Sequence, residues 1–324
     1  MNGPTVLLTC AGRRTSLLSF FRSAVHEIGG RILAADSNPL APTLYLADAG
    51  HYLPQVLVPE YIPSLLTLVE SNNVRLIVPT IDTELPVLSR NSRHFECQRC
   101  LALVSSPRLV DVTSDKWLTV RTCAEAGIRV PRSWLPGGLD ERELPDRIFI
   151  KPRDGSASKD AYSLRRERLE EMLPLVPNAI IQERLEGQEV TIDALLDLDG
   201  QPIHFVPRRR MRTLGGESIE GVTIDDEELR PWVVEVLEFA STLGGRGPLT
   251  IQAFLTESGP VLTEINARFG GGFPLTYAAG GKYPEWILRN MEGEKLTPCF
   301  GKYRRGLYMT RYYVEHFTEE LLWS

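Results

Sequence analysis

Three polar side chains stand at alternate positions near the end of one predicted strand. The stretch from residue 262 to residue 272 reads Leu-Thr-Glu-Ile-Asn-Ala-Arg-Phe-Gly-Gly-Gly. Alternate residues of a strand share one face, so Glu264, Asn266 and Arg268 should point the same way while the apolar residues between them point into the core. Oxygen ligands of this kind suit Mg²⁺, and an arginine can take a phosphoryl oxygen. Gln252, on the strand predicted at 249–256, could supply another oxygen.

The same residues allow a plainer interpretation, in which Glu264 and Asn266 form the water-facing side of a half-buried strand. Three glycines follow them, however, and glycine lets the backbone approach a ligand closely. This context favours a site that binds a metal ion and phosphate groups.

Strands and helices alternate over the first part of the chain. Short apolar runs predict buried strands, and a longer periodic segment predicts a helix. The helix is expected at Thr15–Ile28, and the strands at Thr5–Thr9, Arg31–Ala35, Arg75–Pro79 and Leu101–Val104. Such alternation is typical of a parallel, Rossmann-like sheet.

The turn after the first predicted strand lacks a dinucleotide-binding fingerprint. Cys10–Arg14 contains one glycine and two arginines, whereas NAD-binding folds use G-x-G-x-x-G there. Asp36 stands where such a fold contacts a ribose, so an NAD-dependent enzyme is a remote alternative. The loop Pro79–Glu84 should lead into a helix, with Asp82 and Glu84 either facing a cleft or serving as ordinary first-turn carboxylates.

Two lysines accompany helix and strand patterns in the middle of the chain. Thr113–Lys116 should open a helix that runs through Ala126 and is closed by a glycine. Arg147–Ile150 predicts a strand that ends in Lys151, and a loop of small residues follows at 153–160. A lysine in this place can lie along phosphate groups while the N–H groups of the loop cover them.

Taken in chain order, these segments resemble ATP-grasp enzymes over nearly the whole chain. The pattern Gln, then Glu-x-Asn-x-Arg, is most similar to the large subunit of carbamoyl-phosphate synthetase. The resemblance implies an α/β fold that becomes α+β in its C-terminal part. It places a Rossmann-like pre-ATP-grasp domain at 1–112 and a two-lobed ATP-grasp domain at 113–324, with a lid at about 130–195 and a catalytic lobe at about 196–324.

The resemblance also implies which residues meet ATP. Two lysines and two loop serines would contact the phosphates, the segment 182–185 would read the adenine edge, and a later glutamate would hold the ribose hydroxyls. Relatives carry more glycine in the phosphate loop, where Ala157 and Asp160 stand here. The residues so implied are Lys116, Lys151, Ser156, Ser158, Gln182, Glu183, Leu185 and Glu189.

The metal would be Mg²⁺, for which Mn²⁺ can substitute. By the resemblance, its ligands are Gln252, Glu264 and Asn266, and Arg268 contacts the γ-phosphate. These assignments complete a nucleotide site that begins with the lysines.

Four arginines occur within residues 208–212 of an otherwise acidic protein. The cluster predicts an anion site, unless the segment is simply a solvated strand edge. Strand alternation would place Arg208, Arg210 and Arg212 on one face. In relatives a similar segment enters the cleft near the γ-phosphate, so one or two of these arginines should hold the acceptor carboxylate or the acyl-phosphate. The predicted catalytic residues are Arg268, Lys151 and Arg210.

The implied reaction is an ATP-dependent ligation. Mg²⁺-ATP phosphorylates a small-molecule carboxylate and an amine displaces the phosphate. A second hypothesis is a single-module enzyme, similar to carbamoyl-phosphate synthetase, that acts on bicarbonate or carbamate. A third is a nucleotide-binding regulatory protein without catalysis, against which the intact Lys151, Glu264, Asn266 and Arg268 argue.

Composition restricts the class of partner. The chain has 324 residues, is 43% hydrophobic and carries a formal charge of −6, which allows a large core and argues against nucleic-acid binding. It has no apolar leader and no run long enough to span a membrane, so we expect a cytoplasmic enzyme, with a homodimer as a possible assembly. Five cysteines predict reduced thiols, and Cys97-x-x-Cys100 lacks the second pair that a zinc site needs.

Overall fold

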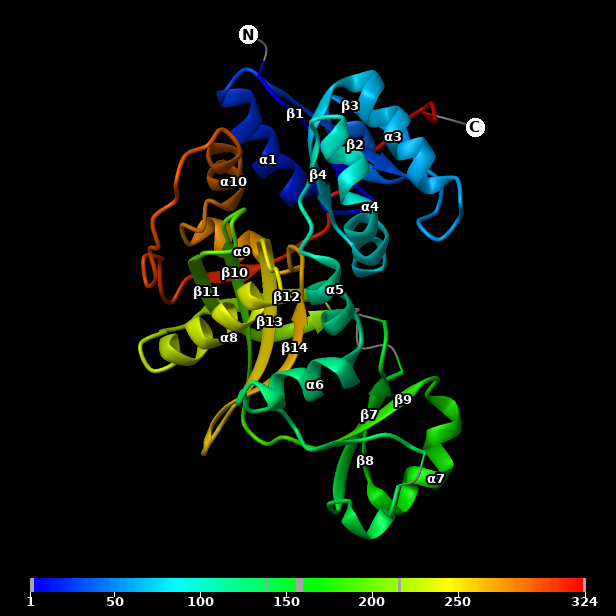
Figure 1. Ribbon diagram of the computed structural model, residues 1–324, viewed down its shortest axis with the longest axis vertical. Coiled ribbons are helices and arrows are strands. Elements are labelled where there is room, and N and C mark those ends of the chain that lie inside the picture. Colours follow the sequence, from blue (N-terminus) through cyan, green and yellow to red (C-terminus); the bar gives the residue numbers. More distant parts are fainter. Residues whose placement is uncertain (1–2, 138, 156–159, 215–216, 323–324) are drawn as a thin grey trace.

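A five-stranded parallel sheet forms the N-terminal part of the computed structural model, which describes residues 3–137, 139–155, 160–214 and 217–322. Its strands are β1 (Thr5–Thr9), β2 (Arg31–Asp36), β3 (Ala49–Tyr52), β4 (Val74–Pro79) and β5 (Leu101–Ala102). They lie in the order β3-β2-β1-β4-β5, and each neighbouring pair is parallel. β1 is buried along its whole length because helices cover both faces of the sheet (Figure 1).

Two pairs of helices flank this sheet. One face carries α1 (Thr15–Glu27) and α2 (Pro42–Leu46), and the other carries α3 (Tyr61–Asn72) and α4 (Leu85–Cys97), which a short 3₁₀ turn, η1 (Asp82–Glu84), precedes. Alternate residues of β1 divide between the two faces. Val6 and Leu8 belong to the core that contains α1, whereas Leu7 belongs to the core that contains α3 and α4.

The helix predicted to open within Thr113–Lys116 and run through Ala126 is confirmed, and a helix that was not predicted precedes it. α5 (Pro107–Ser114) ends just before Asp115, and α6 (Lys116–Glu125) begins just after it. Asp115 has an extended backbone, and its carboxylate accepts a hydrogen bond from the Trp117 N–H (2.9 Å). A carboxylate that caps the first N–H groups starts a new helix here, so the residues before it close the preceding one.

A four-stranded antiparallel sheet lies at the opposite end of the molecule from the N-terminal sheet (Figure 1). Its order is β6-β9-β7-β8, with β6 (Ser133–Trp134), β7 (Arg147–Pro152), β8 (Tyr162–Arg165) and β9 (Ala179–Glu183). Beside it are α7 (Leu169–Met172) and the turns η2 (Glu141–Glu143), η3 (Arg166–Arg168) and η4 (Leu173–Leu175). Ile148, Ile150 and Ile181 lie in a small core of its own, and we call this unit the lid sheet.

A six-stranded antiparallel sheet, the central sheet, lies between the other two (Figure 1). Its order is β14-β13-β10-β11-β12-β15. The strands are β10 (Gln188–Leu196), β11 (Pro202–Leu214), β12 (Glu217–Thr223), β13 (Gly247–Thr256), β14 (Gly259–Asn266) and β15 (Tyr308–Thr310), and the helices are α8 (Arg230–Thr242), α9 (Phe273–Ala278) and α10 (Tyr283–Met291). Ile192 of β10 and Ile251 of β13 pack in the same core as Val236 of α8, which leaves the opposite face of these strands for polar residues.

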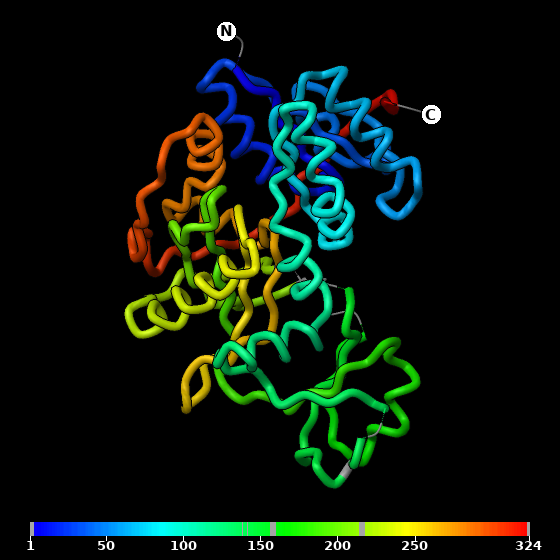
Figure 2. The backbone as a smooth tube through the Cα atoms, in the orientation of Figure 1, coloured from blue at the N-terminus to red at the C-terminus, as the bar shows by residue number. Residues whose placement is uncertain are grey.

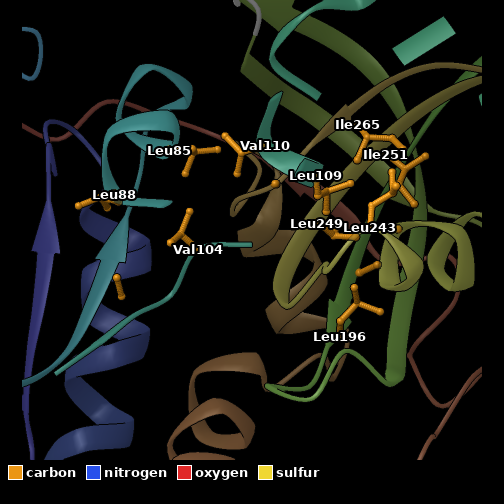
Figure 3. Packing of buried hydrophobic residues seen from close by; sticks show 14 of the residues in the cluster. Leu85, Leu88, Val104, Leu109, Val110, Leu196, Leu243, Leu249, Ile251 and Ile265 are labelled. Carbon is orange, nitrogen blue, oxygen red and sulfur yellow. The ribbon is translucent and has the colours of Figure 1, made fainter. Parts of the chain in front are cut away.

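The N-terminal and central sheets share their cores. One core runs from Leu88 of α4 through Val110 of α5 to Ile251 of β13 (Figure 3). On the other side of the N-terminal sheet, the Phe20 ring of α1 stacks on Tyr277 of α9 with 3.8 Å between ring centroids. The two sheets are therefore packed together much more extensively than either is packed with the lid sheet.

The last described residues return to the N-terminal sheet (Figure 2). After β15 they form neither helix nor strand, and the His316 ring lies 5.2 Å from that of Tyr45. Within the described ranges, no helix is long and apolar enough to cross a bilayer. The predicted fold class, a parallel α/β sheet followed by an antiparallel α+β part, is confirmed.

Candidate active site

A cleft of about 1080 Å³ is lined by all three sheets. The N-terminal sheet contributes the loops after β1 and β4, and the lid sheet contributes β7 and β9. The cleft brings together every predicted site residue that the structure describes: Lys116, Lys151, Gln182, Glu183, Leu185, Glu189, Arg210, Gln252, Glu264, Asn266 and Arg268. Ser156 and Ser158, predicted to contact the phosphates, lie outside the described residues.

Gln252 and Glu264 face each other across β13 and β14. They are paired in the antiparallel register, as are Thr250 and Asn266. Ile265, between the two polar residues of β14, is buried in the core, as strand alternation predicts. The three predicted metal ligands, Gln252, Glu264 and Asn266, therefore lie on one wall of the cleft.

Arg268 reaches the cleft from a turn. β14 ends at Asn266, and the Arg268 N–H donates to the Asn266 carbonyl (2.9 Å), so the strand predicted to carry this arginine stops two residues earlier. Its guanidinium forms an ion pair with Asp82 (2.5 Å) and donates to the Phe269 carbonyl (3.1 Å). Nε has no partner within the described chain, and the side chain is only 12% exposed.

Two lysines approach the cleft from the side of the lid sheet. Burial lowers the pKa of Lys151 to about 8, with the Glu264 carboxylate opposing this shift and Lys116 adding to it. Lys116 begins α6, and its Nζ donates to the carbonyl of Gly155 (2.9 Å). The two ammonium groups therefore lie close enough to interact, beside the loop that the resemblance assigns to the phosphates.

The side chains at the end of β9 are engaged within the lid sheet. Gln182 Nε2 donates to Ser133 Oγ (2.9 Å), and the Glu183 carboxylate accepts from the backbone N–H (3.0 Å) and Nε (2.9 Å) of Arg132. The N–H of Leu185 makes no backbone hydrogen bond to any described residue. The Leu185 N–H, unlike the side chains of Gln182 and Glu183, is thus available to meet the edge of a base.

The arginines of β11 divide between two faces of the sheet. Arg208 and Arg210 line the cleft, but Arg212 does not. The pairing with β12 skips Met211, and an extra residue of this kind reverses the alternation that follows it. The Arg212 side chain is 68% exposed and lies 3.5 Å from Glu220. The prediction that all three arginines share one face is therefore wrong for Arg212.

Arg208 lies beneath the cleft in a buried polar network. Its Nε donates to Asp193 (2.9 Å), whose carboxylate also accepts from Thr276 Oγ1 (2.7 Å) and Thr250 Oγ1 (3.4 Å). A Cβ added to Gly272 would overlap the Arg208 guanidinium, so this close approach requires glycine. The Nη1 atom of Arg208 has no partner within the described chain, although the residue lines the cleft.

Arg210 forms a second ion pair at the surface of the cleft. Its partner is Glu189, the residue that the resemblance assigns to the ribose. The side chains are 15% and 36% exposed, respectively, and burial lowers the pKa of Arg210. A ligand in the cleft could reach both members of this pair.

The N-terminal sheet supplies the remaining wall of the cleft. Arg14 donates to the carbonyls of Thr80 and Phe269, both at 3.3 Å, and so joins the loops after β1 and β4 to the residue that follows Arg268. Asp82, one of the two carboxylates predicted either to face a cleft or to serve as a first-turn group, lines the cleft.

Glu84, the other of those carboxylates, is buried away from the cleft. The Tyr61 hydroxyl donates to it (2.5 Å), and burial raises the pKa of Glu84 to about 7 in spite of that hydrogen bond. Cys10 stands at the edge of the cleft, 3.9 Å from the same hydroxyl, and burial raises its pKa far above the usual range. Cys10 is therefore a neutral thiol at neutral pH.

Two aromatic residues that the sequence interpretation did not assign also line the cleft. Phe149 precedes Lys151 by two positions on β7, and Phe254 follows Gln252 by two positions on β13. Alternate residues of a strand share a face, so the positions two residues from Lys151 and from Gln252 could have been predicted to line the same cleft.

Comparisons with known proteins match two parts of the chain. Residues 176–311 match the family described as ATP-grasp in the biosynthetic pathway with Ter operon, and residues 6–103 match the PylC-like N-terminal domain. A D-alanine–D-alanine ligase from Corynebacterium urealyticum is 27% identical over 215 residues, which cover 56% of this chain and 59% of that protein. The match thus spans a little over half the length of this curated relative.

Solved structures share the fold over nearly the whole chain. The biotin carboxylase domain of 2-oxoglutarate carboxylase from Hydrogenobacter thermophilus, a dimer solved with MgADP, ADP and bicarbonate, has a TM-score of 0.77 at 16% identity and covers 95% of this chain and 74% of its own. An L-amino acid ligase from Bacillus licheniformis has a TM-score of 0.71 at 17% identity, with 90% and 74% covered. Family matches and architecture agree that the chain belongs to the ATP-grasp superfamily, with a PylC-like N-terminal domain.

Proposed function

We propose that this chain is an ADP-forming ligase that activates a carboxylate with ATP and transfers the acyl group to an amine. One observation carries the proposal: the lysines expected at the phosphates and the Gln252–Glu264 oxygens expected at the metal line the same cleft as the loops of the N-terminal sheet. Residues 113–324 would bind ATP, and residues 1–112 would help to bind the acceptor. The names of two relatives, D-alanine–D-alanine ligase and L-amino acid ligase, support this class of reaction.

The donor set of the cleft suits Mg²⁺. Gln252, Glu264 and Asn266 offer amide and carboxylate oxygens, and no group of three or more His, Cys, Asp or Glu side chains gathers in the described part of the chain. Mg²⁺ is typically held by one or two carboxylates together with substrate phosphates, not by an all-protein cage. When bound, it would neutralise phosphate charge during the transfer, and Mn²⁺ could take its place.

In the proposed reaction, a carboxylate oxygen attacks the γ-phosphorus of ATP and the bond to ADP breaks. The amine then attacks the acyl carbon and loses a proton as phosphate leaves. The protein aligns the groups and neutralises charge. Lys116 and Lys151 hold the phosphates, and Arg268 contacts the transferred phosphoryl group. The ion pair between Arg210 and Glu189 opens: Arg210 then contacts the nucleotide or the acyl-phosphate, and Glu189 binds the ribose hydroxyls.

A screen of carboxylates and amines for ADP release tests this proposal. ADP should form only with a suitable acid, and hydroxylamine should trap the activated acid as a hydroxamate. Glu264→Ala should abolish turnover without lowering the melting temperature. The matched control is Glu257→Ala, because Glu257 is exposed in the turn between the same two strands and lies outside the cleft.

Other outcomes of the screen separate the alternatives. ADP release that depends on bicarbonate and needs no organic acid would favour an activity like that of carbamoyl-phosphate synthetase. Tight ATP binding without any ADP release would favour a regulatory protein. AMP and pyrophosphate as products would contradict the proposed chemistry.

A further inference from the structure

Three arginines from distant parts of the chain surround the glycine-rich loop that follows β14. Arg268 and Arg14 both donate to the Phe269 carbonyl, at 3.1 and 3.3 Å. The Arg208 guanidinium lies against Gly272, three residues further along. The loop after β1, which contains Arg14, is thus brought directly beside the residue that the proposed function assigns to the phosphoryl group.

Carboxylates of the protein already neutralise two of these cations. Arg268 pairs with Asp82 (2.5 Å), and Arg208 pairs with Asp193 (2.9 Å). Asp82 is the only acidic residue that the described loops of the N-terminal sheet contribute to the cleft. These loops therefore have no further carboxylate in the cleft with which to balance another cation.

Arg13 is such a further cation. Its side chain is exposed, it lines the cleft, and it makes no hydrogen bond or ion pair to any residue that the structure describes. Asp36, at the end of β2, accepts hydrogen bonds from the N–H groups of Gly12 (2.8 Å) and Asn38 (2.9 Å) instead. The charge of Arg13 is thus directed to the cleft without a partner from the described protein.

The topology of the N-terminal sheet favours ligand binding at this place. β1 and β4 are neighbours, and the strand order runs outward from them in opposite directions. The loops that leave the carboxyl ends of two such strands diverge and form a crevice, where open α/β sheets bind their ligands. Arg13 belongs to one of these loops, and Thr80–Thr83 belongs to the other.

We propose that the acid substrate carries two anionic groups. The carboxylate that is phosphorylated lies near Arg268 and Arg208, which line the cleft, and a second carboxylate or a phosphate group binds Arg13. A guanidinium recognises either anion through paired, charge-assisted hydrogen bonds. This inference rests on the proposed ligase function and names its substrate class as dicarboxylic or phosphorylated acids.

Matched pairs of acids test the inference through turnover. Glutamate and glutamine, or aspartate and asparagine, differ in one carboxylate, and phosphoserine and serine differ in one phosphate. The dianionic member of a pair should have the lower KM for ADP release. Arg13→Gln should raise that KM about tenfold or more, the usual scale for a charged hydrogen bond, and leave the KM of the other member and of ATP unchanged. Which kind of pair responds distinguishes a carboxylate from a phosphate.

A control variant and a binding measurement complete the test. Arg93→Gln removes an exposed arginine of α4 outside the cleft and should change neither KM. Independently of turnover, the dianion should raise the melting temperature of the protein with Mg²⁺ and a non-hydrolysable ATP analogue more than its partner does, and Arg13→Gln should remove that difference.

The outcomes separate this inference from the function on which it rests. Equal KM values and equal melting shifts within every pair, or a preference that survives Arg13→Gln, would overturn the second anion site. Charge-dependent melting shifts without ADP release from any acid would instead contradict the ligase function and retain the anion site.

Discussion

Arg208 and Arg210 lie two residues apart on β11 and line the same cleft, but the protein holds them in different ways. Arg208 pairs with Asp193, and the two side chains are 3% and 2% exposed. Arg210 pairs with Glu189, whose side chain is 36% exposed. The first pair also has Thr276 as a hydrogen-bonding neighbour, whereas the second stands where a nucleotide would enter.

This difference distinguishes the two ends of the cleft. A buried ion pair is hard to open, because removing one partner leaves a charge without water or a counterion. A partly exposed pair contributes less to folding and can exchange its partners for those of a ligand. On this account, the side of the cleft at Arg208, which we call the acceptor end, is preorganised before a substrate arrives. The side at Glu189 and Lys151, which we call the nucleotide end, rearranges when ATP binds.

The largest expected effect is on stability. Arg208→Ala should lower the free energy of unfolding by about 3–5 kcal/mol, because Asp193 is left buried and unpaired. Arg210→Ala should cost about 1 kcal/mol or less, and Arg212→Ala, on the exposed face of the same strand, should have almost no effect. Chemical denaturation measures all three. Equal losses for Arg208→Ala and Arg210→Ala would remove the distinction between the two ends.

The next effect concerns the nucleotide end. Lys151→Ala should weaken ATP binding roughly ten- to a hundredfold, because a hydrogen bond to a charged group contributes about 1.5–3 kcal/mol. Calorimetry measures the affinity, and Lys295→Ala, an exposed lysine outside the cleft, is the control. Unchanged affinity in Lys151→Ala would show that the phosphates bind elsewhere.

A glycine tests how closely the acceptor end is packed. Gly272→Ala should displace the Arg208 guanidinium and cost about 1–3 kcal/mol of stability through overpacking. Gly137→Ala is a matched control, since a Cβ there meets nothing within 4 Å. Equal melting temperatures for the two variants would contradict the close contact between Gly272 and the Arg208 guanidinium.

The smallest effect is a pH dependence of ATP affinity. The Lys151 ammonium has a pKa of about 8, so it carries its charge below that pH and loses it above. ATP affinity should therefore fall as pH rises through about 8, by at most about tenfold per unit. Lys151→Arg should flatten this dependence, because a guanidinium stays charged. The same slope in both proteins would assign the titration to another group.

The sequence predicted the fold where a pattern stays regular over a whole element. Buried runs located β1, β2 and β4 to within a residue or so, and alternation located Glu264 and Asn266. It failed where one residue interrupts the pattern. Met211 adds a residue to β11 and turns Arg212 outward.

The two ends of the cleft also differed in how far the sequence predicted them. The nucleotide end is built from short motifs, each of which brings its residues together locally, and the structure places the described ones in one cleft. The acceptor end depends on pairs between distant segments, such as Arg268 with Asp82 and Arg14 with the Phe269 carbonyl. No local spacing predicts such pairs, because tertiary packing alone brings these residues together.

The central claim is that the cleft forms an acyl-phosphate, and the fate of one oxygen atom tests it most directly. The acid found in the screen is labelled with ¹⁸O in its carboxylate and incubated with ATP, Mg²⁺ and the amine. Attack on the γ-phosphorus makes a labelled oxygen the bridge to phosphorus, and it leaves with phosphate when the amine attacks. The account predicts ¹⁸O in inorganic phosphate and none in ADP. Label in AMP, or amide formation with unlabelled phosphate, would contradict it.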